Sequence, residues 1–472
     1  MDITELSIKE IKKGFAAKDF SAKDVTEGFL SKIEKEDKKI QAFLDVFGPE
    51  AIEKAKKIDE ALAQRKELPL LAGIPCALKD NMLVKGHPVT AASKVLQNYI
   101  APYNATVTEK LEKEMAIILG KLNLDEFANG ASGEYSGFYP TKNPAALDYV
   151  PGGSSSGPAA SVAARMCAFS LGSDTGGSIR QPSSFCGVVG LKPTYGAVSR
   201  YGLIAMASSL DQIGPIAKTV EDAEIVFGII KDKDVMDSTS CDPKKTIKET
   251  DPKKLRIGIV SQAMGEGIDE EVKIAFKQAI EKLGKENIEV REVSLPYMEY
   301  SLACYYIIMT AEVASNLARY DGIKYGKRTD QAKDLIDSYF KTRKEFLGKE
   351  VKRRIMLGTY CLSAGYYDAF YARAQKVKTI IINDFKNAFK KVDLLMLPTS
   401  PILPFKFGEK MADPLSMYMA DLLTVPANIA GLPAMSIPCK KINGLPFGIQ
   451  FMAPAFLEKK IFSFGKFFET LW

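Results

Sequence analysis

The sequence predicts an α/β protein in which helices cover a large and mostly buried β-sheet. Two observations favour this class. Helix-like and strand-like stretches alternate along most of the chain, and the strand-like stretches are short apolar runs of the kind found in buried strands. The chain has 472 residues, 46% of them hydrophobic and 26% charged, as is usual for a soluble globular protein. This length allows one large core or two domains.

The N-terminal segment, residues 1–70, is predicted to be helical. Ser7 and Ser21 are suitable helix N-caps, and Pro49 suits the first turn of a helix that runs to about Arg65. The segment is polar and amphipathic and lacks the apolar core of a signal sequence. Because no apolar run in the chain is long enough to span a membrane, we expect a cytoplasmic protein that does not contact membranes.

The first predicted strand lies in GIPCALKDNMLV, residues 73–84, and ends at Lys79 and Asp80. The alternation continues through TVTEKLEKEM, AIILGKLN, SSSGPAASVAARM and CAFSLGSD, and again through LRIGIV, EEVKIAFKQAIEKLG, IEVREVSL and VDLLMLPTS. Each stretch has the apolar periodicity of a helix or the apolar run of a strand. The pattern therefore predicts a sheet whose strands are connected by covering helices.

Two further segments bear on domain organisation. Residues from about 300 to 390 are dominated by helical patterning, and residues from about 232 to 254 are polar and contain two Asp-Pro pairs. The polar segment is typical of a surface excursion and is a weak candidate for a domain boundary. We therefore predict one domain over residues 1–472, with a helical insertion at about 300–390.

The composition excludes several classes of function. There are 64 basic and 58 acidic residues, interleaved along the chain, which favours a solvated surface over a nucleic-acid-binding stripe. The seven cysteines form no CxxC pair and have no zinc-site spacing, which indicates reduced thiols. His87 is the single histidine, so a His-rich metal site is excluded. We expect neither a metal nor another cofactor in this chain.

Two glycine-serine clusters are the candidate catalytic motifs. The first, Pro-Gly-Gly-Ser-Ser-Ser-Gly at 151–157, opens an alanine-rich helix, and the second, at 172–180, follows a short apolar strand. Glycines at such junctions let backbone N–H groups converge on an anion. We therefore expect the amides from Thr175 through Gly176 and Gly177 to stabilise a developing oxyanion.

Two other interpretations of these glycine motifs are excluded. Residues 153–157 form a G-x-S-x-G string, but the nucleophile elbow of α/β-hydrolases requires a histidine later in the chain, and His87 comes earlier. A phosphate loop requires GxxxxGK followed by Ser or Thr, and Gly120-Lys121 is followed by Leu122.

A serine in these clusters therefore needs a base other than histidine. Lys79 ends an apolar stretch, so it is the lysine best placed to be desolvated and neutral, although such a lysine in isolation is usually exposed.

These residues stand in segments that resemble the amidase signature family. The segments are ALKDN around Lys79, PGGSSSGPAA around Ser154 and GSDTGGSIRQPSSFCGVVGLKPTYG around Ser178, and the resemblance continues through residues 198–223. It implies a large mixed β-sheet sandwiched by helices and a triad of nucleophile Ser178, proton relay Ser154 and base Lys79. One departure is visible, because Ser156 replaces the second-last glycine of the usual GGSSGG and is followed by Gly157 and a proline.

Segments outside the signature resemble one subfamily, the A subunits of glutamyl-tRNA(Gln)/aspartyl-tRNA(Asn) amidotransferases. These segments are residues 316–326, 350–381 and 413–438. The resemblance implies a glutaminase that supplies ammonia within a heterotrimer of A, B and C subunits. The B subunit is then expected to bind ATP, Mg²⁺ and the mischarged tRNA. Which of the two tRNAs is served is not encoded in this chain, because the partners read the tRNA.

Glutamine itself requires two fixed charges in its pocket. Free glutamine carries an α-ammonium and an α-carboxylate, so the pocket needs one anion and one cation. The subfamily resemblance assigns these tasks to Asp421 and Arg354, and it places Tyr305 at the pocket rim. Two alternatives stay open at this point: a free-standing amidase acting on a small organic amide, and a catalytically silent scaffold subunit. The membrane-anchored lipid amidases of the family are disfavoured because an apolar N-terminal anchor is missing.

Overall fold

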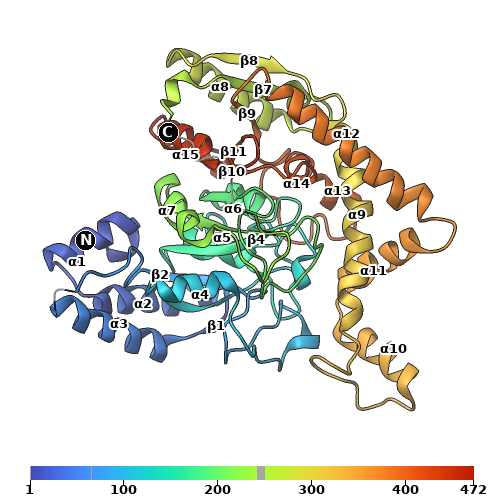
Figure 1. Cartoon of the computed structure of the whole chain (residues 1–472), viewed down its shortest axis with the longest axis horizontal. Coiled ribbons are helices and arrows are strands. Elements are labelled where there is room, and N and C mark those ends of the chain that lie inside the picture. The colour runs from blue at the N-terminus through green and yellow to red at the C-terminus, as the bar shows by residue number, and fades with distance from the viewer. Residues whose placement is uncertain (1, 65, 242–249) are drawn as a thin grey trace.

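The computed structural model describes residues 2–64, 66–241 and 250–472. Within these residues an 11-stranded mixed sheet runs through the molecule, in the order β1-β3-β2-β4-β6-β5-β10-β11-β9-β7-β8 (Figure 1). The strands are β1 (Phe43–Val46), β2 (Pro75–Lys79), β3 (Ile117–Leu122), β4 (Phe169–Asp174), β5 (Val189–Lys192), β6 (Gln212–Ala217), β7 (Ile257–Val260), β8 (Val290–Val293), β9 (Leu394–Pro398), β10 (Ala434–Ile442) and β11 (Leu445–Met452).

The sheet has two parallel blocks joined by antiparallel strands. Strands β3, β2 and β4 are parallel at one side, and β9, β7 and β8 are parallel at the other. Between them, β6, β5, β10 and β11 pair antiparallel with their neighbours. The strands β2, β3 and β4 are buried on both faces, as their continuous apolar runs require.

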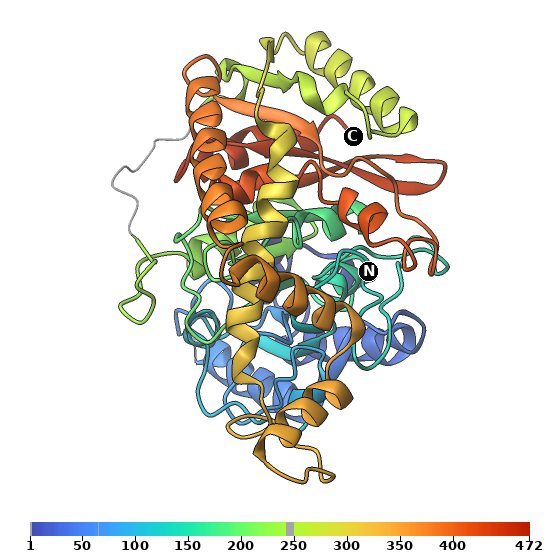
Figure 2. The same ribbon diagram turned by 90° about the vertical axis from the view of Figure 1, so that its right-hand side faces the viewer.

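Helices cover both faces of this sheet (Figures 1 and 2). They are α1 (Ile8–Ala17), α2 (Ala22–Ile40), α3 (Gly48–Ala63), α4 (Thr106–Lys113), α5 (Ser156–Ala163), α6 (Arg180–Cys186), α7 (Val220–Ile230), α8 (Glu270–Lys285), α9 (Ser301–Asn316), α10 (Leu335–Phe346), α11 (Lys349–Leu362), α12 (Arg373–Ala388), α13 (Pro414–Met419), α14 (Val425–Ile429) and α15 (Glu458–Glu469). The predicted α/β class with a large mixed sheet between helices is confirmed.

The N-terminal segment is helical. Ser7 and Ser21 each close a capping box, at the start of α1 and α2 respectively, so two of the unpaired N–H groups at each helix start are satisfied. Pro49 stands in the first turn of α3. That helix ends at Ala63, and Arg65, its expected end, lies outside the described residues. The described part of the chain contains no helix that is both long and apolar enough to cross a membrane.

Between β8 and β9 the chain is helical, from α9 to α12. Figures 1 and 2 show α9 running along one side of the molecule with α11 and α12 beside it, and α9 packs against α11, α12 and α14. This is the segment predicted as a helical insertion at about 300–390. The polar segment at about 232–254 falls partly outside the described residues, which omit 242–249. One domain over residues 1–472 stays a prediction.

Candidate active site

The three candidate catalytic residues come from neighbouring parts of the sheet. Lys79 is the last residue of β2, Ser154 precedes α5, and Ser178 lies in the turn between β4 and α6. Because β2 and β4 are parallel neighbours, their carboxyl ends meet at one edge of the sheet. The Nζ of Lys79 lies 2.8 Å from Oγ of Ser154, and the N–H of Ser155 donates to the carbonyl of Ser178 over 3.1 Å. The peptide bond between Gly153 and Ser154 is cis.

Lys79 is completely buried among serine hydroxyls. Besides Ser154, its Nζ lies 2.9 Å from Oγ of Ser155 and 3.0 Å from Oγ of Ser173. Burial lowers the pKa of Lys79 to about 7, although the carboxylates of Asp125, Asp174 and Asp211 act in the opposite direction. A large fraction of this lysine is therefore neutral near neutral pH, as a base must be.

The hydroxyls around Lys79 orient the neutral amine. Ser155 Oγ donates its hydrogen to the carbonyl of Ser173 over 3.0 Å, and Ser173 Oγ accepts from Nδ2 of Asn81 over 3.0 Å. Both hydroxyl oxygens are thus placed to accept the two N–H groups of a neutral amine. The carbonyl of Ser173 lies 3.4 Å from Nζ and can only accept, so the amine lone pair is left for the remaining hydroxyl neighbour, Ser154. In this arrangement a neutral Lys79 can accept a hydrogen bond from Ser154.

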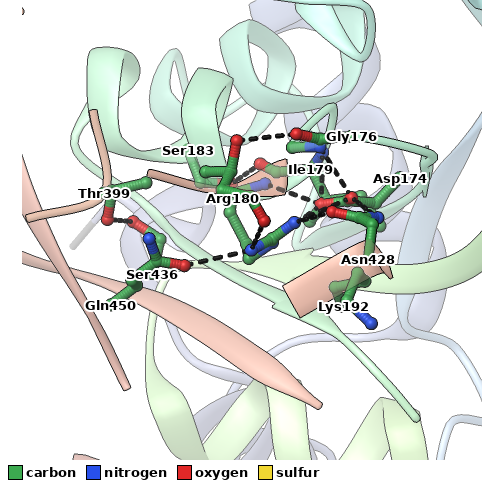
Figure 3. A network of polar contacts seen from close by, with 12 residues as sticks. Asp174, Gly176, Ile179, Arg180, Ser183, Lys192, Thr399, Asn428, Ser436 and Gln450 are labelled. Atoms are coloured by element: carbon green, nitrogen blue, oxygen red, sulfur yellow. Dashed lines mark hydrogen bonds and ion pairs between the residues drawn. The ribbon is translucent and has the colours of Figure 1, made fainter. Parts of the chain in front are cut away.

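A buried ion pair fixes the turn that carries Ser178. The carboxylate of Asp174 accepts from the N–H of Gly177 over 2.8 Å and from the N–H of Ile179 over 3.2 Å, on either side of Ser178. Arg180 donates to the same carboxylate at two points, Nε to Oδ2 over 3.0 Å and Nη2 to Oδ1 over 3.1 Å (Figure 3). Burial alone would raise the pKa of Asp174, but Arg180, Lys192 and Asn428 together outweigh it and hold the pKa at about 2.

The remaining N–H groups of Arg180 bind the C-terminal part of the chain. Nη1 donates to the carbonyl of Thr424 over 2.9 Å. It also donates to Oε1 of Gln450 over 3.0 Å, and Nη2 donates to Oδ1 of Asn428 (Figure 3). All five donors of the guanidinium therefore have acceptors. Residues 175–179, named the nucleophile turn after the predicted role of Ser178, are joined in this way to the segment around Asn428.

The predicted oxyanion residues line the same turn. The hydroxyl of Thr175 donates to Oδ1 of Asp211 over 2.7 Å. A Cβ at Gly176 would lie 2.6 Å from the ring of Tyr305, and a Cβ at Gly177 would lie 2.1 Å from Oγ1 of Thr424, so both positions require glycine. The N–H of Gly177 is already bound to Asp174, unlike the expectation that it faces an oxyanion. Among the described residues, the N–H groups of Thr175, Gly176 and Ser178 make no hydrogen bond.

The three predicted glutamine-binding residues lie on three different elements. Tyr305 is on α9, Arg354 is on α11 and Asp421 lies between α13 and α14. All three are buried, and the phenol ring of Tyr305 lies against Gly176. Burial raises the pKa of Asp421 to about 7, even though the positive charge of Arg354 acts in the opposite direction. Binding a substrate cation would lower this pKa and favour the carboxylate.

Two tyrosines connect Arg354 with Asp421. The rings of Tyr306 and Tyr418 stack with centroids 4.0 Å apart, and the guanidinium of Arg354 lies 5.7 Å from the first centroid and 5.5 Å from the second. The hydroxyl of Tyr306 donates to Oδ2 of Asp421 over 3.4 Å. Arg354 also donates through Nε to Oε1 of Glu350 over 2.9 Å. A cation and an anion are thus held near each other by one aromatic pair.

Several residues of this site were not predicted from the sequence. Three of them stand beside a predicted residue, Ser155 beside Ser154, Asp174 beside Thr175 and Tyr306 beside Tyr305, so adjacency was the available signal for these. The others are not adjacent to a predicted residue. Those around the lysine amine are Asn81 and Ser173, and those around Arg354 are Glu350 and Tyr418. Those that support the turn of Ser178 are Arg180, Asp211, Thr424, Asn428 and Gln450.

The structure shows the contacts of two residues singled out in the sequence, Ser156 and His87. Ser156, which departs from the family pattern, starts α5, and its hydroxyl donates to Oγ1 of Thr141 over 3.3 Å. His87 lies with Nε2 3.1 Å from Oε2 of Glu50 and its ring against Phe47. Within the residues that the structure describes, no group of three or more His, Cys, Asp or Glu side chains is arranged to hold a metal ion, and no cysteine forms a disulfide.

Comparison with known proteins shows which family this chain resembles along its length. A family model described as Amidase matches residues 24–462. The protein named as the A subunit of glutamyl-tRNA(Gln) amidotransferase in Thermoanaerobacter pseudethanolicus is 52% identical over 99% of this chain and 97% of its own length. The protein of the same name from Microcystis aeruginosa is also 52% identical, over 98% of this chain and 97% of its own length.

Solved structures give the same result. The crystal structure of the glutamyl-tRNA(Gln) amidotransferase A subunit from Thermotoga maritima is 39% identical, with a TM-score of 0.81 over 98% of this chain and 94% of that one. A peptide amidase from Stenotrophomonas maltophilia is 27% identical, with a TM-score of 0.82 over 99% of this chain and 96% of that one. With a family model matched over residues 24–462 and relatives half identical along nearly all of its length, this chain belongs to the amidase family.

Proposed function

We propose that this chain is the glutamine-hydrolysing subunit of a tRNA-dependent amidotransferase, which supplies ammonia for converting Glu-tRNA(Gln) to its amide. The observation that carries the proposal is the full-length match, 52% identical, to proteins named as A subunits of glutamyl-tRNA(Gln) amidotransferase. An arrangement for hydrolysing an amide supports it, because the buried amine of Lys79 lies 2.8 Å from Ser154. The hypothesis includes ammonia supply for converting Asp-tRNA(Asn) to its amide as well.

In this mechanism Ser178 is the nucleophile. Its Oγ attacks the side-chain amide carbon of glutamine while its proton passes to Ser154, which gives its own proton to the neutral Lys79. When the tetrahedral intermediate collapses, the proton returns through Ser154 to the leaving nitrogen and ammonia departs. The γ-glutamyl ester left on Ser178 is then hydrolysed by a water that the same relay deprotonates, releasing glutamate. When the second tetrahedral intermediate collapses, the proton passes back through Ser154 to Oγ of Ser178, so that acylation and deacylation each return the relay to its starting protonation state.

The oxyanion of the intermediate is stabilised by backbone amides of the nucleophile turn. We assign this role to the segment Thr175–Gly176–Gly177, with Thr175, Gly176 and the adjacent Ser178 as the donors. The N–H of Gly177 contributes to the site indirectly, because its bond to Asp174 holds the turn in place. Donors fixed before the reaction need no reorganisation when the negative charge develops.

The two charges of glutamine are assigned to the pair described above. Arg354 binds the α-carboxylate, Asp421 binds the α-ammonium, and Tyr305, which lies against Gly176, borders the pocket next to the scissile amide. The support for this assignment is that both charged groups are buried and held beside one aromatic pair. A buried, oriented charge binds its counterpart more strongly than an exposed one.

The remaining half of the reaction is assigned to partners. Amidation of a tRNA-bound carboxylate requires activation by ATP, and the sequence contains no phosphate loop of the GxxxxGK type. We propose that a B subunit binds ATP, Mg²⁺ and most of the mischarged tRNA, that a C subunit completes a heterotrimer, and that the complex acts in the cytoplasm. This chain then needs no cofactor of its own.

The decisive experiment is a comparison of substrates. Glutamate release from glutamine is measured for the chain assembled with its B and C subunits, ATP and mischarged tRNA, alongside hydrolysis of a small amide such as propionamide. Glutamine turnover with amide transfer to tRNA is the expected result. Efficient hydrolysis of propionamide with no turnover of glutamine would instead identify a free-standing amidase, and failure on both substrates would identify a scaffold subunit.

A further inference from the structure

Thr424 connects the nucleophile turn with the segment that carries Asp421. Its side chain is fully buried, and its Oγ1 donates to the carbonyl of Gly176 over 2.7 Å while lying 3.1 Å from the carbonyl of Asp421. Oγ1 of Thr424 is also close to Gly177, since a Cβ at this glycine would lie 2.1 Å from the same oxygen. The hydroxyl therefore packs directly against the backbone of the turn.

The peptide group between Gly176 and Gly177 is held at both ends. The carbonyl of Gly176 accepts from Thr424, and the N–H of Gly177 donates to Oδ1 of Asp174 over 2.8 Å. In a trans peptide these two groups point in opposite directions, so the two hydrogen bonds fix the rotation of the peptide plane. The neighbouring amides of Gly176 and Ser178 are attached to this plane, and their directions depend on it.

The backbone of Thr424 is held equally firmly. Its N–H donates to the carbonyl of Asp421 over 3.1 Å, and its own carbonyl accepts from Nη1 of Arg180 over 2.9 Å. Arg180 in turn is paired with Asp174, which holds the far end of the peptide plane. The backbone of Asp421, which carries the carboxylate, and the amides of the nucleophile turn are thus connected through one buried threonine.

We propose that Thr424 is a positioning residue that fixes the distance between the oxyanion amides and the anion that receives the α-ammonium of the substrate. The proposal rests on the proposed function for the identity of that substrate. Without the hydroxyl, the carbonyl of Gly176 loses its partner in a buried site and the peptide plane is free to turn. The oxyanion donors then lose their alignment, and the turn is no longer fixed relative to Asp421.

Two matched variants test this role. Thr424→Ser keeps the hydroxyl and Thr424→Ala lacks it, and the two side chains differ by one oxygen atom. In the complete complex, we expect Thr424→Ala to lower kcat for propionamide and for glutamine at least about tenfold and to raise KM for glutamine alone, whereas Thr424→Ser stays within about threefold of the wild type. Thr424→Val, which keeps the volume but not the hydroxyl, is expected to behave as Thr424→Ala.

The outcomes separate positioning from support of the fold. Equal activity of Thr424→Ala and Thr424→Ser would overturn the proposal, whether both are active or both are impaired. Thermal unfolding is followed in parallel, and if Thr424→Val does not fold, the alanine and serine pair still decides. If the wild-type complex does not turn over glutamine, the proposed function fails, but the effect of the hydroxyl on propionamide hydrolysis still tests the role of Thr424 at the turn.

Discussion

Asp174 and Arg180 form a two-point ion pair that is completely buried and spans the nucleophile turn from both sides of Ser178. The planar guanidinium matches the two carboxylate oxygens, and its other donors reach Thr424, Asn428 and Gln450, so that one side chain holds three segments in a fixed relation. The pair itself lies outside the proton relay. Its role in the proposed reaction is to keep the nucleophile and the oxyanion amides in place.

Arg180→Lys is therefore expected to be strongly destabilising although it keeps the charge. A lysine ammonium has three donors from one atom and cannot replace five donors arranged in a plane. Breaking a buried network of this kind costs about 3–5 kcal/mol. Chemical denaturation should show this loss, and the folded fraction should have a reduced kcat. Unchanged unfolding midpoint and activity would show that the ion pair is dispensable.

Much of the fold follows from local patterns in the sequence. The strand that ends at Lys79 was predicted because its apolar run is uninterrupted, as strands buried on both faces require. The antiparallel strands β10 and β11 were not predicted individually. Burial changes from complete to partial along β10, and β11 is buried along nearly its whole length but includes Pro446, Gly448 and Gln450. Neither a continuous apolar run nor a strict alternation therefore marks the two strands.

The residues of the candidate site are harder to predict from local sequence patterns than the fold is. A lysine at the end of a strand is usually exposed, and it was the family resemblance that joined Lys79 with Ser154 and Ser178. The supports of the turn could not be found from local signals, because Arg180 binds Thr424, Asn428 and Gln450, which lie 244, 248 and 270 residues away in the sequence. Contacts at such separations depend on the order of strands in the sheet, which no short motif encodes.

Ser178→Ala should abolish hydrolysis of glutamine while leaving the fold intact, because it removes the acyl acceptor and only one oxygen atom. Ser154→Ala should be nearly as damaging, and the double variant should be little worse than either single one, since residues acting as one unit have non-additive effects. Steady-state kinetics on all three variants provides the measurement. A γ-glutamyl adduct detected by mass spectrometry on the Ser178→Ala protein would disprove the assignment of the nucleophile.

Lys79 is expected to make the reaction rise with pH. Its pKa of about 7 is below the ordinary value for lysine, so the neutral base gains population as the pH increases from about 6 to about 8. Propionamide carries no titrating group, so kcat/KM for this substrate should show the increase with pH directly. Lys79→Arg should be inactive at every pH, since arginine remains protonated. His87→Asn is the matched control and should keep both the rate and the profile, whereas a profile altered in this variant would assign the base to His87.

Asp421 and Arg354 should discriminate glutamine from uncharged amides. Asp421→Asn and Arg354→Gln remove one charge each, and a charge-assisted contact contributes about 1.5–3 kcal/mol, or about one to two decades in KM for glutamine. KM for propionamide should not change. Because Arg354→Gln leaves the buried Glu350 with Arg353 as its only paired arginine, the double variant Glu350→Gln/Arg354→Gln is the appropriate control for folding. Equal losses on both substrates would mean that these residues support the fold.

The carboxylate of Asp421 predicts a second pH effect, which should be seen with glutamine as substrate and not with propionamide. Burial raises the pKa of Asp421 to about 7, so the anion that binds the α-ammonium becomes more populated as the pH increases through this value. KM for glutamine should therefore fall over this range, and it should not do so in Asp421→Asn.

Productive glutamine turnover is expected to depend on the partner subunits. Ammonia is mostly protonated at neutral pH and would be lost to the solvent, so a subunit that only releases it must be docked to the site that uses it. The test measures glutamate release by this chain alone and then with the B and C subunits, ATP and mischarged tRNA. An increase of about tenfold or more corresponds to at least about 1.4 kcal/mol of coupling between the sites. A matched reconstitution with uncharged tRNA should give a smaller increase, because it provides no carboxylate to amidate. Full turnover by the isolated chain, unchanged by the partners, would contradict the coupled role and favour a free-standing amidase.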